Sequence, residues 1–257
     1  MSFKIFGTVA IWRISGSQFD AMTFPISSAL LQDIAVDCLK RLPEEACGLV
    51  VNGVVVPCKN IHSSPLTNFA ISPEDYAKAE DLGDVELVYH SHVGGECKFS
   101  SHDIKACKQS NLPWLIYHAT SGNHIYADPR GTAPFVGRQW SYGIHDCYGL
   151  MRDFYLQEFD IELDDFERGE EMEWEKGGWS MFADNWKAQG FYEIEEPQRR
   201  GDVAFMQIDA PSINHAGIFA GDSNLFYHHL MGRLSELSVW GSFWRKATVK
   251  FIRHKEA

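Results

Sequence analysis

The chain has 257 residues, 45% of them hydrophobic and 23% charged, and its formal net charge is −12. These proportions are typical of a folded protein with a sizeable core and exclude a chain that is disordered throughout, while the length mildly favours two domains. The acidic balance argues against a protein that binds nucleic acid or an anionic membrane through bulk electrostatics, so we expect neither as a partner.

The cysteines and the apolar runs indicate where the chain is made. Six cysteines stand at irregular spacings without a C-x-x-C pair, which fits neither a disulfide framework nor a thiolate zinc ribbon. No apolar run approaches the roughly 18 residues that span a bilayer, and the N-terminal stretch TVAIWRI is interrupted by Arg13. We expect a soluble product of a reducing cytoplasm, without membrane insertion.

The first half of the chain has the pattern of a mixed α/β domain. Apolar residues recur at helical spacing from Leu30 to Leu42, and Pro43 ends that run. Asn52-Gly53, between ACGLVV and VVV, is a strong hairpin signal. The elements expected next are a helix near 73–80, a strand over 85–92, a helix from near Ser100 and a strand over 114–120. We assign this domain to residues 24–130 and leave residues 1–23 uninterpreted.

A pair of histidines at the end of the strand over 85–92 suggests a metal site. His90 and His92 stand at i and i+2, so their side chains point to the same side of the strand and can share one ion. A seven-residue loop then leads to Ser100, and Asp103 follows in the first helical turn. Two imidazoles and one carboxylate leave a fourth tetrahedral position for water, which is the arrangement of a catalytic zinc.

A zinc-bound water needs a base, and Glu45 in EEACGLVV is the candidate, with Glu44 as its rival. An alternative interpretation treats Ser100 and Asp103 only as helix-capping residues. The string H-x-H-x7-S-x2-D with an upstream E-x-C-G resembles the JAMM/MPN metalloprotease motif. The resemblance implies that His90, His92 and Asp103 bind zinc, that Glu45 is the general base and that Ser100 helps to hold the oxyanion. Val93 and Phe99 occupy places where that family often has proline, so the loop shape differs.

Residues 127–140, ADPRGTAPFVGRQW, are rich in Gly, Pro and Arg and separate two patterned regions. We place the domain boundary here and assign residues 131–257 to a second domain. Residues 158–175 carry ten carboxylates and one basic residue, Arg168. We interpret that stretch as a solvated surface segment, with an acidic wall facing a cationic ligand as the alternative.

The second domain begins with a helix that opens on a cysteine. Cys147 is followed by Leu150, Met151 and Phe154 at +3, +4 and +7, so Cys147 belongs to the buried face of an amphipathic helix. A cysteine at a helix N-terminus meets unpaired backbone N–H groups, which we expect to lower its pKa. Cys147 is therefore placed as a nucleophile, although a buried structural cysteine is the alternative.

Three short strands are predicted within 200–208, 214–221 and 225–230. His215 begins the second strand and His228 lies on the third, so they can serve as the base for Cys147 and as the group that orients this base. His229 is the rival of His228. The motifs DCYGL, GDV, HAGIFAG and YHH resemble the NlpC family of papain-like cell-wall peptidases, and Tyr148 replaces the serine that usually follows the nucleophile.

A JAMM-like domain followed directly by an NlpC-like domain resembles the tail-tip assembly proteins of long-tailed phages. The resemblance covers about Phe24 to the end of the chain. It implies synthesis in the host cytoplasm, a place in the virion tail tip beside other tail-tip proteins, and action on peptidoglycan at the cell wall. A structural tail-tip hub with little turnover is a competing hypothesis. A host-encoded deubiquitinase-like enzyme, suggested by the first domain alone, is a third.

Overall fold

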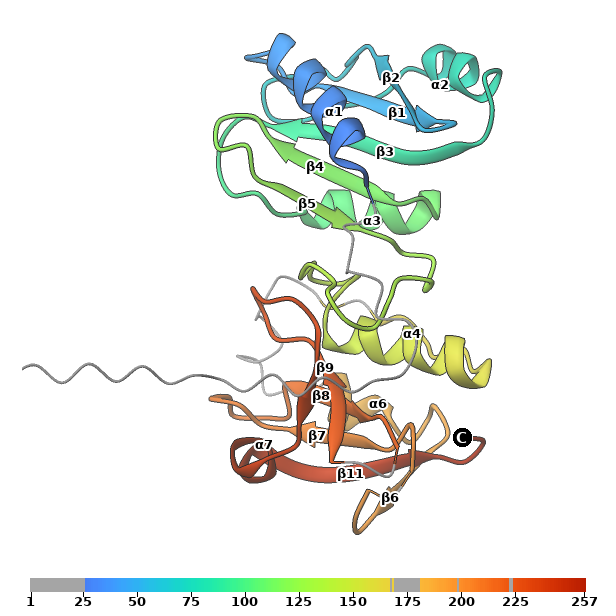
Figure 1. The fold of residues 1–257 in the computed structure, drawn as a ribbon, viewed down its shortest axis with the longest axis vertical. Coiled ribbons are helices and arrows are strands. Elements are labelled where there is room, and N and C mark those ends of the chain that lie inside the picture. Colours follow the sequence, from blue (N-terminus) through green and yellow to red (C-terminus); the bar gives the residue numbers. More distant parts are fainter. Residues whose placement is uncertain (1–25, 167, 169–180, 198, 222–223) are drawn as a thin grey trace, which may run out of the picture.

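The computed structural model describes residues 26–166, 168, 181–197, 199–221 and 224–257, and the uninterpreted segment 1–23 lies outside them. Two domains follow each other along the long axis of the molecule, each built around its own sheet (Figure 1). The two-domain α/β architecture predicted from the sequence is confirmed. Among the described residues, no helix combines the length and the apolar character that crossing a membrane requires.

The first sheet has the strand order β2-β1-β3-β4-β5, in which only β3 and β4 run parallel. Asn52 and Gly53 both have positive φ values, 50° and 71°, as the predicted tight hairpin between β1 and β2 requires. The strands are β1 (Cys47–Val51), β2 (Val54–Cys58), β3 (Val85–His92), β4 (Trp114–His118) and β5 (His124–Ala127).

Helices cover both faces of this sheet. Helix α1 (Ser28–Lys40) packs its buried Ile34 and Cys38 on one face. Helices α2 (Pro73–Glu80) and α3 (Ser101–Ser110) contribute Ala79 and Cys107 to the core on the other. The predicted first helix is confirmed up to Lys40, but Leu42 lies beyond its end and is 41% exposed. The chain turns there, so Leu42 does not continue the buried face.

The second sheet is antiparallel throughout, with the order β10-β9-β8-β7-β11-β6. Its predicted members are β7 (Val203–Met206), β8 (His215–Phe219) and β9 (Leu225–His228). The sequence interpretation missed the strands β6 (Phe191–Ile194), β10 (Glu236–Val239) and β11 (Thr248–His254) and the short helices α6 (Met181–Asn185) and α7 (Ser242–Ala247).

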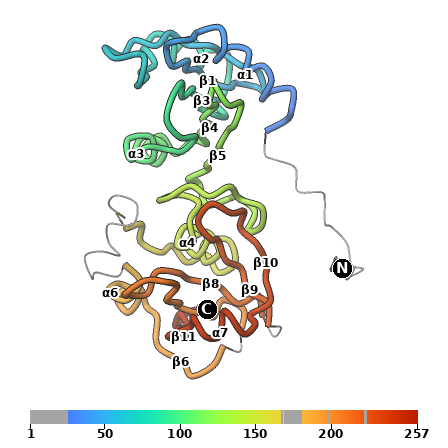
Figure 2. The backbone as a smooth tube through the Cα atoms, turned by 90° about the vertical axis from the view of Figure 1, so that its left-hand side faces the viewer, coloured from blue at the N-terminus to red at the C-terminus, as the bar shows by residue number. Residues whose placement is uncertain are grey.

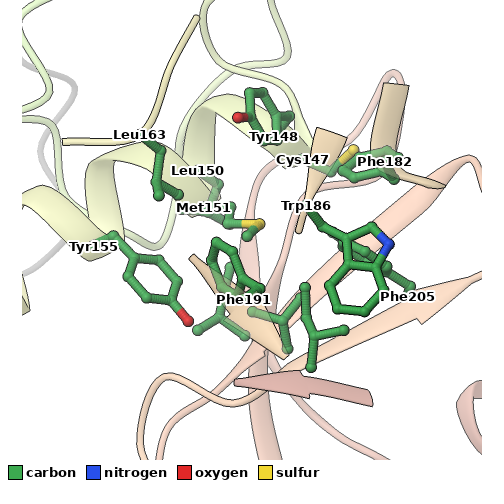
Figure 3. Close-up of a cluster of buried hydrophobic side chains, with 14 of the residues drawn as sticks. Cys147, Tyr148, Leu150, Met151, Tyr155, Leu163, Phe182, Trp186, Phe191 and Phe205 are labelled. Atoms are coloured by element: carbon green, nitrogen blue, oxygen red, sulfur yellow. The ribbon is translucent and has the colours of Figure 1, made fainter. Parts of the chain in front are cut away.

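Helix α4 (Cys147–Phe159) packs on this sheet and carries the predicted apolar face. Leu150, Met151 and Phe154 are fully or almost fully buried, together with Phe205 of β7. Figure 3 shows Leu150, Met151 and Phe205 converging from α4 and β7, with Cys147 at one end of the cluster beside Phe182. The core of the second domain therefore holds the first turn of α4 against the sheet.

The segment between β5 and α4 is anchored to the second domain. Arg138 is buried, and its guanidinium donates to Asp153 Oδ2 at 2.5 Å and to Ala133 O at 2.6 Å. The loop between β9 and β10 reaches back to this segment (Figure 2), where Ser235 Oγ accepts from the Arg138 N–H at 2.9 Å. The linker therefore lies against α4 and this loop.

Candidate metal centre and candidate cysteine site

The structure brings together the three side chains predicted to bind zinc. His90 and His92 end strand β3, and Asp103 lies in the first turn of α3. The Nε2 atoms of the two histidines are 3.2 Å apart. His90 Nε2 lies 3.4 Å from Asp103 Oδ1, and His92 Nε2 lies 3.8 Å from Asp103 Oδ2. Nitrogen and oxygen donors from two elements therefore face one small volume.

This donor set fits a tetrahedral zinc ion. Two imidazole nitrogens that share a zinc at about 2.0–2.1 Å lie about 3.3 Å apart, close to the spacing of the two Nε2 atoms. Burial lowers the pKa of His90 to about 3, with Asp103 offsetting part of this effect, so His90 carries the neutral imidazole that a metal requires. Two aromatic side chains also fix the orientation of the His90 ring. Phe69 stacks on it with ring centroids 4.3 Å apart, and Trp114 meets it edge-on with ring centroids 5.7 Å apart.

Ser100 and Asp103 form a helix cap and a metal-facing pair at once. Ser100 Oγ accepts from the Asp103 N–H at 3.1 Å and donates to Asp103 Oδ2 at 2.6 Å, while the Ser100 N–H donates to the same oxygen at 2.9 Å. These bonds make a capping box at the start of α3. The cap fixes the carboxylate so that Oδ1 faces His90, and the two interpretations of these residues are therefore compatible.

Glu45 lies at the entry to β1, next to the cluster. Cys47 pairs with His90 across β1 and β3, which places the start of β1 beside the end of β3. Burial, and then the Asp103 carboxylate, raise the pKa of Glu45 to about 7. Glu44 is exposed to solvent. Asn60, which the sequence interpretation missed, donates from Nδ2 to Glu45 O at 2.9 Å and so holds this residue in place.

The second site forms where α4 and β8 begin. Cys147 is the first residue of α4 and His215 the first residue of β8. Both line one cavity of about 290 Å³. Backbone N–H groups of Ala216 and Tyr148 act on the Cys147 thiol and lower its pKa. Most other side chains around this cavity are aromatic or apolar, among them Trp140, Tyr142, Phe182, Ile208, Leu230 and Met231.

The expectation of a lowered pKa for Cys147 is wrong, although the N–H group at the helix start acts in the expected direction. The thiol residue is only 7% exposed, and burial raises its pKa to about 12, with a further contribution from the Asp146 carboxylate. The two N–H groups and the nearby Arg168 stabilise the thiolate, but desolvation destabilises it by a larger amount, so they offset only part of the rise in pKa. Burial also lowers the pKa of His215 to about 3, so this imidazole is neutral and a weaker base than a free histidine.

His228 and His229, the two candidates for the residue that orients His215, differ in their surroundings. His228 pairs with Gly217 across β9 and β8 and therefore shares a sheet face with His215, whose ring centroid is 5.7 Å away. His228 Nε2 lies 3.1 Å from Glu236 Oε1, and Trp244 packs against its ring at 4.4 Å. His229 instead meets Arg233 O through Nε2 at 3.0 Å and packs edge-on against Trp140, with the ring centroids 5.1 Å apart.

Comparisons with known proteins agree with both halves. A model of prokaryotic homologs of the JAB domain matches residues 27–130, and the NlpC/P60 family model matches residues 137–253. Tail tip assembly protein K of Escherichia phage N15 is 36% identical over 219 residues, which are 83% of this chain and 89% of that protein. Its counterpart in Escherichia phage lambda is 33% identical over 72% of this chain and 89% of that protein.

The chain belongs to the tail tip assembly protein K family. A probable TtuB-protein conjugate cleaving protease of Thermus thermophilus is also similar, at 28% identity over 44% of this chain and 81% of that protein. The metal-type cluster lies within the JAB-like match, and the cysteine site lies within the NlpC/P60 match.

Within the NlpC/P60 domain, the acidic stretch differs from its prediction. Glu158, Asp160, Glu162 and Asp164 are exposed, as a solvated segment requires, while residues 167 and 169–175 lie outside the described part. Leu163 and Arg168, however, are buried. The guanidinium of Arg168 pairs with Asp146 and Asp165, which makes its burial possible. Arg168 also lies over the Tyr148 ring and lines the cysteine cavity, a role that no local pattern indicated.

Proposed function

We propose that this chain is a phage tail-tip component that hydrolyses amide bonds of stem peptides or cross-bridges in peptidoglycan. The observation that carries the proposal is the meeting of Cys147 and His215 in one cavity at the start of α4 and β8. Membership of the protein K family supports a place in the virion tail tip, beside other tail proteins, after synthesis in the host cytoplasm. The NlpC/P60 match supports the wall as substrate.

The chemistry follows from the protonation states. Cys147 Sγ attacks the amide carbonyl carbon while His215 accepts the thiol proton, and His215 then gives this proton to the leaving amine. Water hydrolyses the resulting thioester, with His215 again accepting and returning a proton. The thiol pKa is raised and that of His215 is lowered, so the proton moves during the attack and not before it. His228 orients His215, and backbone N–H groups at the helix start hold the oxyanion.

The JAB-like domain supplies a second hydrolytic site of isopeptidase or protease type. His90, His92 and Asp103 would hold zinc, which when bound would supply a water nucleophile at neutral pH. The Ser100 hydroxyl donates to Asp103 Oδ2 in the free site and turns its proton to the oxyanion when one forms. Glu45, whose pKa of about 7 suits proton transfer in both directions, is the general base. A tail-assembly protein or the wall is its substrate.

One observation favours the rival function, a structural tail-tip hub with little turnover. The Cys147 thiol is buried, and its pKa is raised to about 12. A site in this state reacts slowly until a substrate or an assembly partner changes its surroundings.

The deciding experiment incubates the full chain with Gram-negative and Gram-positive peptidoglycan and identifies released fragments by mass spectrometry. Cys147→Ala is the test variant, and Cys97→Ala, which removes a thiol from the other domain, is the control. Release of stem-peptide fragments by the parent chain and Cys97→Ala, but not by Cys147→Ala, is the expected result. Equal release by all three variants would exclude Cys147 as the nucleophile, and no release from any of them would favour the hub.

A further inference from the structure

A series of ion pairs with alternating charges connects the JAB-like domain to the cysteine site. Lys108 Nζ, in the last turn of α3, lies 2.7 Å from Asp165 Oδ2. Asp165 Oδ1 lies 2.9 Å from a terminal nitrogen of Arg168, and Arg168 Nε lies 2.8 Å from Asp146 Oδ2. Asp146 directly precedes Cys147. This series of ion pairs therefore begins on α3, the helix that carries Asp103, and ends next to Cys147, the nucleophile of the proposed peptidase.

The side chains in this series become more buried from Lys108 to Asp146. The side chains of Lys108 and Asp165 are 29% and 26% exposed, whereas those of Arg168 and Asp146 are each 4% exposed. Two buried opposite charges depend on each other, because removal of one leaves the other desolvated and unpaired. Arg168 is held at its outer end by Asp165, which also meets Arg152 of α4 at 3.6 Å. Lys108 is the contribution of the JAB-like domain.

Asp146 has a structural task at the start of α4. Its Oδ1 accepts from the Gly149 N–H at 2.7 Å, and its Oδ2 accepts from the Gly143 N–H at 2.8 Å. This N-cap fixes the first turn of α4 and thereby the position of Cys147. The Asp146 charge also raises the pKa of the Cys147 thiol, and the Arg168 charge lowers it. Arg168 therefore allows a capping carboxylate to stand beside a thiol.

We propose that Lys108 and Asp165 are positioning residues for the cysteine site, because they hold Arg168 against the Asp146 carboxylate beside Cys147. The JAB-like domain thus helps to build the site of the NlpC/P60 domain. The proposal rests on the proposed function only in taking Cys147 as the reactive thiol.

The test measures the alkylation of Cys147 by iodoacetamide in the full chain, followed peptide by peptide in mass spectrometry between pH 6 and pH 11. Arg168→Met is expected to slow the reaction about tenfold, because it leaves the Asp146 charge unopposed next to the thiol. Lys108→Met is expected to slow it about threefold, as suits loss of a partly exposed ion pair. In both variants the pH profile moves to higher pH. Besides Cys147 itself, the titratable or charged residues that line the cavity are Asp146, Arg168, Asp209, His215, Tyr142 and Tyr148.

Three controls separate positioning from a general loss of structure. Lys105→Met removes a charge from the exposed side of the same helix and should leave the profile unchanged. Lys108→Arg should retain the parental profile. Lys108→Met should add nothing in an Asp165→Asn background, because both changes break the same contact. Identical profiles for Lys108→Met and Lys105→Met would overturn the proposal.

The readout needs no peptidase activity. A chain that releases no wall fragments but shows the Lys108 effect would remove the proposed function and leave this inference standing. A chain that cleaves the wall with an alkylation rate independent of Lys108 would do the reverse.

Discussion

The two candidate sites are built in different ways from the same chain. All three proposed zinc ligands come from one stretch, His90 to Asp103, in which a strand end and a helix start face each other. The cysteine site draws on α4, β8 and β9, with Arg168 added from an irregular segment. His92 keeps a side chain that is 17% exposed, whereas Cys147 lies under an apolar rim. A site built from one local stretch can be recognised from spacing, but a site built from distant elements needs the fold.

Burial shifts the pKa values of both sites in the same way. It lowers the pKa of His90 and of His215 to about 3 and raises that of Glu45 to about 7. In each case the environment disfavours the charged form. At the proposed metal site His90 thereby stays neutral and the pKa of Glu45 lies near neutral pH, whereas burial disfavours the thiolate of Cys147. The same physical effect thus suits the chemistry proposed for the metal site and opposes formation of the Cys147 thiolate.

Removal of a metal ligand should separate the two sites most sharply. His90→Ala is expected to weaken zinc binding by more than about 100-fold, because even the loss of an outer partner costs about 10- to 100-fold. Alkylation of Cys147 should stay unchanged. Equilibrium dialysis with zinc analysis by atomic emission checks this, with the exposed His102→Ala as control. Equal zinc loss in both variants would contradict the assigned ligand set.

A methyl group added at the start of α4 should destabilise only the NlpC/P60 domain. A Cβ at Gly149 would lie 1.8 Å from Ile144 O, whereas one at Gly94 meets nothing within 4 Å. Gly149→Ala is expected to lower the free energy of unfolding by about 2 kcal/mol, as overpacking does. Gly94→Ala, in the loop beside the metal cluster, is the control. Hydrogen exchange measured for each sheet should show the loss in the second sheet alone, and a loss in the first would contradict independent unfolding.

Exchange of each candidate for the histidine that orients His215 should distinguish His228 from His229. His228→Gln is expected to lower kcat of wall-fragment hydrolysis at least about tenfold, because the base loses its orienting partner. His229→Gln should have little effect, since this ring faces Trp140 and Arg233 O. Steady-state rates with purified muropeptides provide the comparison. A larger loss in His229→Gln would reverse the assignment.

Acid should weaken the NlpC/P60 domain through its buried imidazoles. Burial lowers the pKa of His145 to about 3 and of His229 to about 4, so below pH 6.5 the unfolded chain binds protons that the folded domain does not. The contribution of these neutral imidazoles to the free energy of unfolding is therefore present above pH 6.5 and lost as the pH falls. The loss is about 1 kcal/mol per imidazole between about pH 6.5 and pH 5.5. Urea unfolding between pH 7 and pH 5 should show a shallower dependence in His145→Gln. The exposed His102→Gln is the control, and parallel curves for both variants would reject the linkage.

Much of the fold was predictable wherever one short pattern decides one element. Asn52-Gly53 marks the hairpin, and the spacing of Leu150, Met151 and Phe154 marks the buried face of α4. Strand β10 was missed because three of its four residues are exposed, so no alternation of buried and exposed positions reveals it. It is a strand because its backbone pairs with β9, which no pattern within β10 itself indicates.

The sequence by itself determined the residue types of both sites, the spacing of the proposed zinc ligands and the order of the two domains, because each is visible in short motifs without knowledge of the long-range contacts. The tertiary structure alone decided that Phe69 stacks on His90, that Asn60 holds Glu45 and that Arg168 is buried against Asp146. It also decided the sign of the shift in the pKa of Cys147. A helix start acts on a thiol locally, but desolvation sums over every element packed around it, and no linear pattern records that sum.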